Sequence, residues 1–446
     1  MSTRTLYLCY FGLREPLVQT QVLPYLRQLA VGGVVEVSLL TFEPELRRRW
    51  TPEDLDAERA RLAAEGIRWF HLPYHKRPTL PATLYDVAAG ARLALRAVRR
   101  HGIEVLHARG HVAALMGALA KRLARGGGGR PRLIFDIRGF MPEEYTDAGV
   151  WPEGGYLYRG TKRVERHLFA AADAFVVLTE RAREILFPGC ADTDARGRPV
   201  EVIPCCVDAD RFQVAEGLSR ADLRRELGVE GRRVVVYVGS FGGWYLTDEM
   251  TEFIAAAHRR DPRTFALILT QSAAAPVRER LLRLGLKPAD FLADQVSPAE
   301  VPRYLKAADV AISLIRACYS KQSSSPTKIA EYLASGLPVI CNAGVGDLDQ
   351  LIAEDRVGIV IREFTPDAYA RALAELDELA AGDDLANRCR ASARRRFDLK
   401  RVGGEKYRRL YRRLLQRERD AEPLSQGGRA GSSRVEFSIT ARKGPQ

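Results

Sequence analysis

Short runs of apolar, mostly β-branched residues alternate along the chain with longer stretches in which apolar residues recur every three or four positions. The first pattern is typical of buried strands, and the second of amphipathic helices packed on them. The first half of the chain has five strand patterns, at Leu6–Tyr10, Val35–Leu40, Val105–His107, Leu133–Asp136 and Phe175–Leu178. The second half has five more, at Val234–Gly239, Phe265–Leu269, Val310–Leu314, Pro338–Cys341 and Gly358–Ile361. This alternation predicts an α/β fold with two Rossmann-like, doubly wound parallel sheets facing a cleft.

The two series of strands are separated by a break at Ile203–Phe212 and a polar segment that follows it. We therefore predict two domains, residues 1–205 and 206–385, each about as long as a single hydrophobic core supports. Residues 386–420 are expected to form a basic helical segment that crosses back to the N-terminal domain. Residues 421–446 are rich in Gly, Ser and Arg and are expected to be disordered, and Gly126–Gly129 predicts a flexible surface turn.

Composition narrows the class of protein. Hydrophobic residues make up 46% of the 446 positions and charged residues 28%, which is ordinary for a soluble globular protein. No apolar run approaches the roughly 20 residues that span a bilayer, and the N-terminus lacks a signal-peptide pattern. The seven cysteines are odd in number and scattered, so a reducing cytoplasm without disulfides or structural zinc is expected. A redox-active Cys205–Cys206 pair is the alternative.

The net charge of +13 is concentrated near the C-terminus, where residues 388–419 hold 14 Lys and Arg against 3 Asp and Glu. Apolar residues in this stretch recur at helical spacing, at Tyr407, Leu410, Tyr411, Leu414 and Leu415. A helix with one apolar and one basic face predicts docking on a domain, on an anionic membrane surface, or on both. The alternative is a solvated helix. Nucleic-acid binding is disfavoured because the charge sits on one helix without an aromatic-rich basic motif.

The most informative segment is Ser-Ser-Ser-Pro-Thr-Lys-Ile-Ala-Glu-Tyr-Leu-Ala-Ser-Gly-Leu-Pro-Val-Ile, residues 323–340. Ser325 suits the N-cap position and Pro326 the first turn, so a helix is expected to start here and to end at Gly336. The N–H groups and the positive dipole end of a helix start favour an anion such as a diphosphate. Lys328 can reach the same anion, and Glu331 could accept hydrogen bonds from ribose hydroxyls. An ordinary capped helix with a Lys–Glu pair is the alternative.

Other candidates for a nucleotide site follow the strands of the second half. Val238–Tyr245 is a glycine-rich turn in which Gly239, Ser240, Gly242 and Gly243 would let the backbone approach a phosphate closely. Tight turn geometry is the alternative explanation. Thr270 and Gln271 follow the next strand and would line the base or ribose pocket by position.

The segment at residues 323–340 resembles the C-terminal signature of glycosyltransferase family 4, whose members have the GT-B fold. In that family a Glu-x7-Glu motif precedes a run similar to Glu-Tyr-x-Ala-x-Gly-x-Pro-Val-Ile. Glu331 matches the second Glu, which the resemblance implies binds the donor ribose. Ser323 stands where the first Glu is usual, and Ser240 where an Arg is common. The resemblance is to a branch with Ser-Ser-Ser-Pro-Thr-Lys, and its donor-binding residues would be Ser324, Ser325, Pro326, Thr327, Lys328 and Glu331.

The first half also resembles that branch. Pro16–Leu26, which includes Gln19, looks like its Pro-Leu-Gly-Gln-Ser-Gln-Val-Leu-Pro-Tyr-Leu opening, with Val18 in place of a Gly. Phe135–Phe140, followed by Glu144, Asp147 and Trp151, is similar to its Phe-Asp-Met-Arg-Gly-Phe run.

Arg138 would emerge at the carboxyl end of a strand and could stabilise charge on a diphosphate leaving group. A salt bridge with Glu144 is the alternative role for Arg138. Gln19, Arg109, Glu144 and Asp147 are candidate contacts to the acceptor or the sugar, whereas His107 fits a packed core residue better.

The resemblance implies a retaining, metal-independent transfer from a nucleoside diphosphate sugar, with a UDP-sugar favoured and no other cofactor. Lys328 and Arg138 would be the catalytic residues, and a glycan or lipid-linked molecule the acceptor. The branch implies cell-surface polysaccharide or glycolipid synthesis in the cytoplasm, with peripheral association on the inner face of the cell membrane. Two alternatives remain, a catalytically silent GT-B partner subunit and a nucleotide-sugar 2-epimerase.

Overall fold

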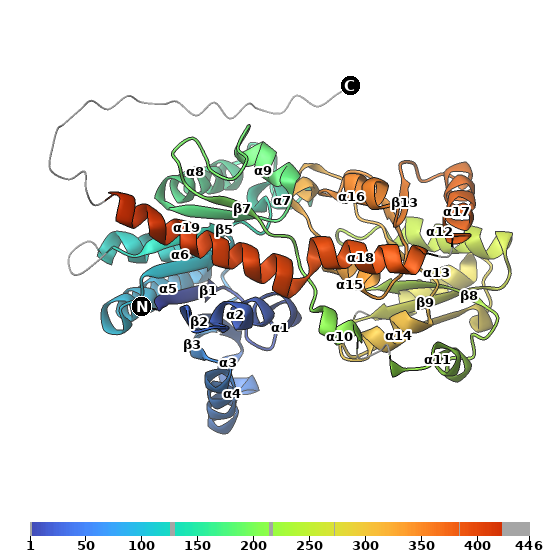
Figure 1. Ribbon diagram of the computed structural model, residues 1–446, viewed down its shortest axis with the longest axis horizontal. Helices are drawn as coiled ribbons and strands as arrows, with labels where there is room; N and C mark the ends of the chain where they lie inside the picture. The colour runs from blue at the N-terminus through green and yellow to red at the C-terminus, as the bar shows by residue number, and fades with distance from the viewer. Residues whose placement is uncertain (1, 125–129, 214–216, 272, 383, 422–446) are drawn as a thin grey trace.

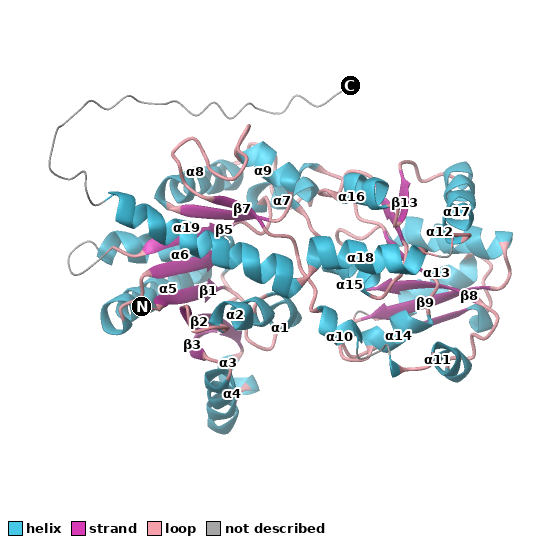
Figure 2. Cartoon of the chain, viewed as in Figure 1, coloured by secondary structure: helices cyan, strands magenta, loops and turns pink. Residues whose placement is uncertain are grey.

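Each half of the chain forms its own parallel sheet with helices on both faces, and the two sheets lie beside each other along the long axis of the molecule (Figures 1 and 2). The computed structural model describes residues 2–124, 130–213, 217–271, 273–382 and 384–421. The expected turn at Gly126–Gly129 and the expected tail beyond Ala421 lie outside the described residues. The predicted fold class, α/β with two parallel sheets, is confirmed.

The N-terminal half is built on a seven-stranded sheet of order β3-β2-β1-β4-β5-β6-β7, in which all neighbouring strands are parallel. Its strands are β1 Thr3–Cys9, β2 Val35–Pro44, β3 Ile67–Tyr74, β4 Val105–Arg109, β5 Arg132–Asp136, β6 Ala174–Val177 and β7 Val200–Val202. Its helices are α1 Pro16–Gln21, α2 Leu23–Ala30, α3 Leu46–Arg49, α4 Pro52–Ala64, α5 Thr79–His101, α6 Gly110–Leu123, α7 Met141–Asp147, α8 Tyr156–Ala171 and α9 Glu180–Leu186.

The C-terminal half has a six-stranded parallel sheet of order β10-β9-β8-β11-β12-β13. Its strands are β8 Arg233–Val238, β9 Thr264–Thr270, β10 Phe291–Gln295, β11 Val310–Ser313, β12 Val339–Asn342 and β13 Gly358–Ile361. Its helices are α10 Ala209–Gln213, α11 Arg220–Glu226, α12 Thr247–Arg260, α13 Ala275–Arg283, α14 Val301–Ala307, α15 Thr327–Ala334, α16 Leu348–Asp355, α17 Pro366–Ala380 and α18 Leu385–Phe397, with 3-10 turns η3 Pro288–Asp290 and η4 Tyr319–Ser323.

All ten predicted strands are present, but the sequence pattern missed β3, β7 and β10. Each missed strand lies at an edge of its sheet, where one side has no neighbouring strand. Edge strands are only partly covered, so they carry polar residues that dilute the apolar signal. β3 shows this, because it contains an Arg, a His and a Pro among its eight residues.

The helical patterns of the sequence do not mark every helix. Residues Gln21–Ala30 have such a pattern and contain α2, but the short helix α1 lies before α2 and is separated from it at Val22, whose backbone departs from helical geometry. The sequence analysis missed α16, which packs against α18, whereas α18 lies within the helical segment expected at residues 386–420 and packs against α15. α18 buries Leu385, Cys389 and Phe397 in the core of the C-terminal half.

The end of the chain crosses from one half to the other. After α18, a π-helical turn at Leu399–Gly404 leads into α19, Glu405–Ala421, which lies against the sheet of the N-terminal half (Figure 1, red). The predicted apolar stripe of α19 is buried there, with Tyr407, Leu410, Tyr411 and Leu414 each at most 2% exposed. This segment therefore connects the two cores.

Up to Gln416, where the side chains of α19 are described, most of the basic ones are engaged within the protein. Arg409 pairs with Glu201, Arg413 pairs with Asp192, and the Lys406 ammonium donates to the Val202 carbonyl. The apolar face of α19 is buried on the N-terminal half, so the expected docking of this helix on a domain is confirmed. No helix in the described ranges is long and apolar enough to span a membrane.

Candidate functional site

The candidate donor residues come from three segments at the carboxyl edge of the second sheet. They lie on the turn after β8, at the last residue of β9, and at the start of α15. Open α/β sheets bind ligands at this edge, because the loops there are free to surround a ligand. The carboxyl ends of β4 and β5 in the N-terminal half carry the other candidates, Arg109 and Arg138.

Lys328 lies in the first turn of α15, and its ammonium is enclosed by two tyrosine rings. Its Nζ lies 4.4 Å from the ring centroid of Tyr237 and 3.9 Å from that of Tyr245, and 3.3 Å from the Tyr237 hydroxyl. Burial lowers the pKa of Lys328 to about 7, although Glu331 acts in the opposite direction. A cation held in this way is poised to take up an anion, which would restore its charge.

Gly239 makes this arrangement possible. Its φ of +145° is one that side chains disfavour, and a Cβ here would lie 2.6 Å from Lys328 Nζ. Gly242 and Gly243 also have positive φ angles, and the Gly242 N–H donates to Thr247 Oγ1 over 3.2 Å. The Ser240 carbonyl accepts a hydrogen bond from the Tyr237 hydroxyl. The glycine-rich turn is therefore folded directly over the lysine predicted to bind the diphosphate.

Glu331 follows Lys328 by one turn and forms an ion pair with Arg211, Oε1 to Nη1, over 3.6 Å. Burial raises the pKa of Glu331, and Arg211 and Lys328 act against this rise. Arg211 comes from α10 in the segment between the halves, and the sequence analysis missed it. No local spacing could have found it, because 120 positions separate the two residues. Thr270 is buried at the end of β9, and Gln271 donates its side-chain amide to the Val296 carbonyl.

The start of α15 differs from the expectation. The helix begins at Thr327 with Pro326 in the N-cap position, and Ser325 does not cap it. Instead, Ser325 Oγ accepts from the N–H of Cys205 over 3.1 Å. Ser323, which stands at the usual Glu position, is buried; its hydroxyl accepts from the Phe140 N–H and donates to the Ser320 carbonyl. Ser323 and Ser325 therefore join the two halves of the molecule, because their hydroxyls accept hydrogen bonds from backbone N–H groups of the N-terminal half. Ser324 lies between them, directly after η4.

Arg138 lies two residues beyond β5, at the carboxyl end of the N-terminal sheet. Its Nη1 is 3.4 Å from Asp136 Oδ1 and its Nη2 is 3.5 Å from Cys205 Sγ, while its buried Nε has no hydrogen-bond partner. The alternative salt bridge with Glu144 is wrong, since Glu144 pairs with Lys321. Burial opposes ionisation of Asp136, but Arg138 and His107 outweigh it and hold the Asp136 pKa well below its usual range.

Glu144 and Asp147 contact the opposite half of the molecule. Glu144 Oε1 accepts from Lys321 Nζ over 2.9 Å, and Asp147 Oδ2 accepts from the Ser320 N–H over 2.8 Å. Lys321 Nζ also lies 3.9 Å from the ring centroid of Trp244. In this arrangement both carboxylates hold η4 against α7, so their predicted acceptor contacts would require those bonds to be exchanged.

Two further candidates have local structural roles. Gln19 donates its side-chain amide to the Leu13 carbonyl over 2.6 Å, which shapes the segment between β1 and α1. His107 is fully buried and packs on Tyr7, and its Nδ1 lies 3.1 Å from the Tyr411 hydroxyl. The interpretation of His107 as a packed core residue is confirmed.

Tyrosines of α19 reach the strand that carries Arg138. The Tyr407 hydroxyl donates to Asp136 Oδ2 over 3.0 Å, beside the Tyr7 hydroxyl at 3.4 Å. The sequence placed Tyr407 on an apolar stripe and did not indicate this contact. Asp136 is thereby held between α19 and the candidate catalytic arginine.

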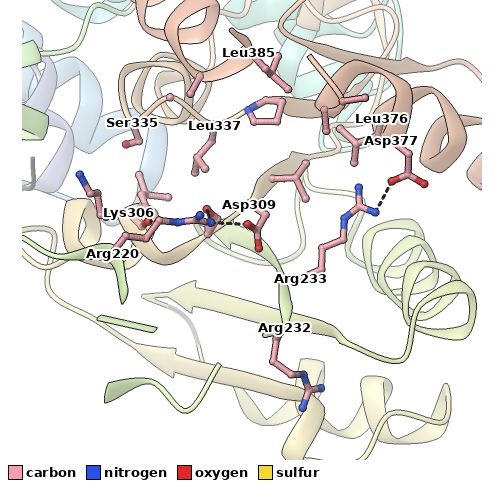
Figure 3. A pocket seen from close by; sticks show the side chains of 18 of the residues that line it. Arg220, Arg232, Arg233, Lys306, Asp309, Ser335, Leu337, Leu376, Asp377 and Leu385 are labelled. Carbon is pink, nitrogen blue, oxygen red and sulfur yellow. Dashed lines mark hydrogen bonds and ion pairs between the residues drawn. The ribbon is translucent and has the colours of Figure 1, made fainter. Parts of the chain in front are cut away.

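The large cavity in Figure 3, about 840 Å³, lies at the opposite edge of the C-terminal sheet. It opens beside Arg233 and Val310, the first residues of β8 and β11. Its wall carries the ion pairs Arg220–Asp309 and Arg233–Asp377. Because it lies at the amino ends of the strands, it is not part of the donor site.

Comparisons with known proteins agree with this architecture. Over nearly their whole length, solved structures of the GT-B type superpose on the chain. They include sucrose-phosphate synthase from Thermosynechococcus elongatus, with a TM-score of 0.68, 16% identity, and 93% of this chain and 100% of that chain covered. They also include Anabaena HepE in complex with UDP and glucose, with a TM-score of 0.60, 15% identity, and coverage of 95% and 100%. At these identities the likeness establishes the fold.

Sequence matches establish the family. The family model described as Glycosyltransferase Family 4 matches residues 31–211, and the model described as Glycosyl transferases group 1 matches residues 219–396. The chain belongs to glycosyltransferase family 4, a family of retaining enzymes. A curated relative, D-inositol 3-phosphate glycosyltransferase of Corynebacterium glutamicum, is 28% identical over 264 residues. That match covers 56% of this chain and 60% of the relative.

Proposed function

We propose that the protein transfers a sugar from a nucleoside diphosphate sugar to a glycan or lipid-linked acceptor, with retention at the anomeric carbon. A UDP-sugar is the proposed donor. The observation that carries the proposal is the buried Lys328, which lies at the start of α15 directly beneath the turn at Gly239. A helix start, an adjacent cation and a glycine turn together form a site suited to a diphosphate.

Each candidate residue has a proposed task in this reaction. The N–H groups of Thr327 and Lys328, together with the Lys328 ammonium, bind the diphosphate, and Glu331 accepts hydrogen bonds from the ribose. Arg138 stabilises the charge that develops on the leaving diphosphate. The donor's own phosphate assists attack of the acceptor hydroxyl on the same face of the sugar. Closure of the two halves excludes water and limits hydrolysis of the donor.

The proposed domain roles follow from these positions. Residues 1–205 form the acceptor side and residues 206–385 the nucleotide-sugar side. Residues 386–420 cross back to the N-terminal domain. The proposed setting is assembly of cell-surface polysaccharide or glycolipid on the cytoplasmic face of a membrane. Contact with anionic lipid would use outward side chains of α19 such as Arg412, which is exposed.

A thermal-shift screen against UDP, GDP, ADP and dTDP tests the proposal. UDP at about 100 times its Kd should stabilise the folded protein by about 2.7 kcal/mol and raise Tm. Lys328→Ala should melt cooperatively without responding to UDP. No response of the wild-type protein to any nucleotide would refute donor binding.

A catalytically silent GT-B subunit is the second candidate, and Ser323 favours it. The hydroxyl at the usual Glu position is committed to Phe140 and Ser320 and cannot hold a sugar. A silent subunit that retains the site would bind UDP but turn over no donor, either by transfer or by hydrolysis. Conversion of a UDP-sugar to its 2-epimer would instead support the epimerase alternative.

A further inference from the structure

Arg109 is a buried cation without a partner. It is the last residue of β4 and only 6% exposed, and its Nη1 has no hydrogen-bond partner. Among the described residues, none forms a hydrogen bond or an ion pair with its guanidinium. Its neighbours across the sheet are Cys9 on β1 and Asp136 on β5. A buried charge of this kind is costly unless something neutralises it.

The nearest carboxylate is already shared. Asp136 contacts Arg138, accepts from the hydroxyls of Tyr407 and Tyr7, and lies 3.6 Å from His107 Nε2. Burial lowers the pKa of His107, so the imidazole is mostly neutral at pH 7 and needs no counter-charge. Asp136 can neutralise only one of the two guanidinium groups, and it pairs with Arg138, so the positive charge of Arg109 remains.

The other buried carboxylates near this edge of the sheet are occupied too. Asp86 accepts from Tyr10 and His75, Glu143 pairs with Lys162, and Glu165 pairs with His111. Glu43, at the end of β2, is also engaged. Its oxygens accept from the N–H of Leu13 and from the hydroxyl of Thr41. Burial raises its pKa, which further weakens it as a counter-ion. The charge on Arg109 is therefore not met by any carboxylate of the described chain at this edge.

Two buried N–H groups without an acceptor belong to arginines at the same edge of the sheet. Arg109 is the register partner of Asp136 across the sheet, and Arg138 Nη1 lies 3.4 Å from Asp136 Oδ1, so both arginines lie beside Asp136. Arg109 Nη1 and Arg138 Nε are both buried N–H groups without an acceptor. Both residues keep some exposed surface, 6% for Arg109 and 12% for the Arg138 side chain. Guanidinium groups bind phosphate and carboxylate through paired hydrogen bonds.

We propose that Arg109 binds an anionic group of the acceptor, either a phosphate or a carboxylate, beside Arg138, whose proposed task is at the leaving diphosphate of the donor. This inference rests on the proposed function, and it narrows the acceptor to an anionic molecule. Arg109 belongs to the acceptor side because it lies in the N-terminal half, whereas Lys328, Gly239 and Glu331 all lie in the C-terminal half. The anion supplies the missing counter-charge and accepts a hydrogen bond from the unmatched Nη1 of Arg109.

The test uses the full chain saturated with UDP, so that the diphosphate site is filled. Inorganic phosphate and methyl glucuronide are the probes, with methyl glucoside as the neutral control, and binding is measured by calorimetry. At least one anionic probe should bind the wild-type protein. Arg109→Gln should bind it roughly tenfold to a hundredfold more weakly, with UDP affinity unchanged. Arg92→Gln, which alters an exposed arginine of α5, is the matched control and should behave as wild type.

The outcomes separate the two proposals. Failure of UDP to bind the wild-type protein counts against the proposed function, whereas UDP binding without any response to the anionic probes overturns the acceptor site alone. Loss of UDP affinity in Arg109→Gln would assign Arg109 to the donor and overturn the inference. If Arg109→Gln does not fold, Arg109→Lys serves instead, and it should retain weaker anion binding. Preference for phosphate or for the glucuronide identifies the kind of anion.

Discussion

Replacing Lys328 with Met should make the ligand-free protein more stable and abolish its response to UDP. The ammonium is buried against Tyr237 and Tyr245, and its pKa is about 7 instead of the ordinary 10.5. Methionine has a similar length and no charge, so it fills the same space without the desolvation cost. The ligand-free wild-type protein is thus less stable than it could be, because it keeps an ionisable group buried at the proposed diphosphate site.

The size of the effect follows from the pKa. A difference between 10.5 and about 7, at about 1.4 kcal/mol per pH unit, corresponds to an upper limit of about 5 kcal/mol. Between pH 7 and 10.5 the unfolded chain holds this proton and the folded protein does not, so wild-type stability rises with pH in that window. Lys328→Met should lack this rise. At pH 7 its Tm should be higher by several degrees, since about 1 kcal/mol shifts Tm by about 2–4 °C in a domain of this size.

The assay is thermal denaturation from pH 6.5 to 9.5, with and without UDP. Lys287→Met, which removes an exposed lysine of the same half, should match wild type under all conditions. UDP affinity of the wild type should also fall as pH rises above about 7, because the diphosphate binds the protonated lysine. A variant that is less stable than wild type, or that still responds to UDP, would refute the reasoning.

Three further changes test other parts of the site. Glu331→Gln should weaken UDP binding roughly tenfold to a hundredfold but leave pyrophosphate binding unchanged, as measured by calorimetry, because only the ribose contact is altered. Tyr407→Phe removes the hydroxyl that holds Asp136 and should lower kcat with an unchanged Kd for UDP; an equal effect on both would indicate a general loss of structure. Ser323→Glu should lower stability by about 1–3 kcal/mol in denaturant titration, because the site is buried and filled, and a gain in stability would contradict this.

Local pattern predicted much of the fold. Interior strands such as β8 and β9 are nearly continuous apolar runs because helices cover both of their faces, so each can be recognised from its own sequence. The helix around Lys328 could be predicted for a similar reason, since the helix start, the lysine and the glutamate lie within about one turn of sequence. The edge strand β3 and the π-helical turn at Leu399–Gly404 have no such signature, and both were missed.

The sequence by itself thus determined the two parallel sheets, the family and the segment that we propose carries the donor site. Tertiary structure alone decided which partners these residues have. In the folded chain Arg211 forms an ion pair with Glu331, and Glu144 forms one with Lys321. The Tyr407 hydroxyl donates a hydrogen bond to Asp136. Tertiary structure also left Arg109 without a counter-ion. The physical reason is that strand and helix patterns reflect burial, and the residue type at each position reflects its own burial. Charge pairing instead depends on the distance between residues that are up to hundreds of positions apart in the sequence.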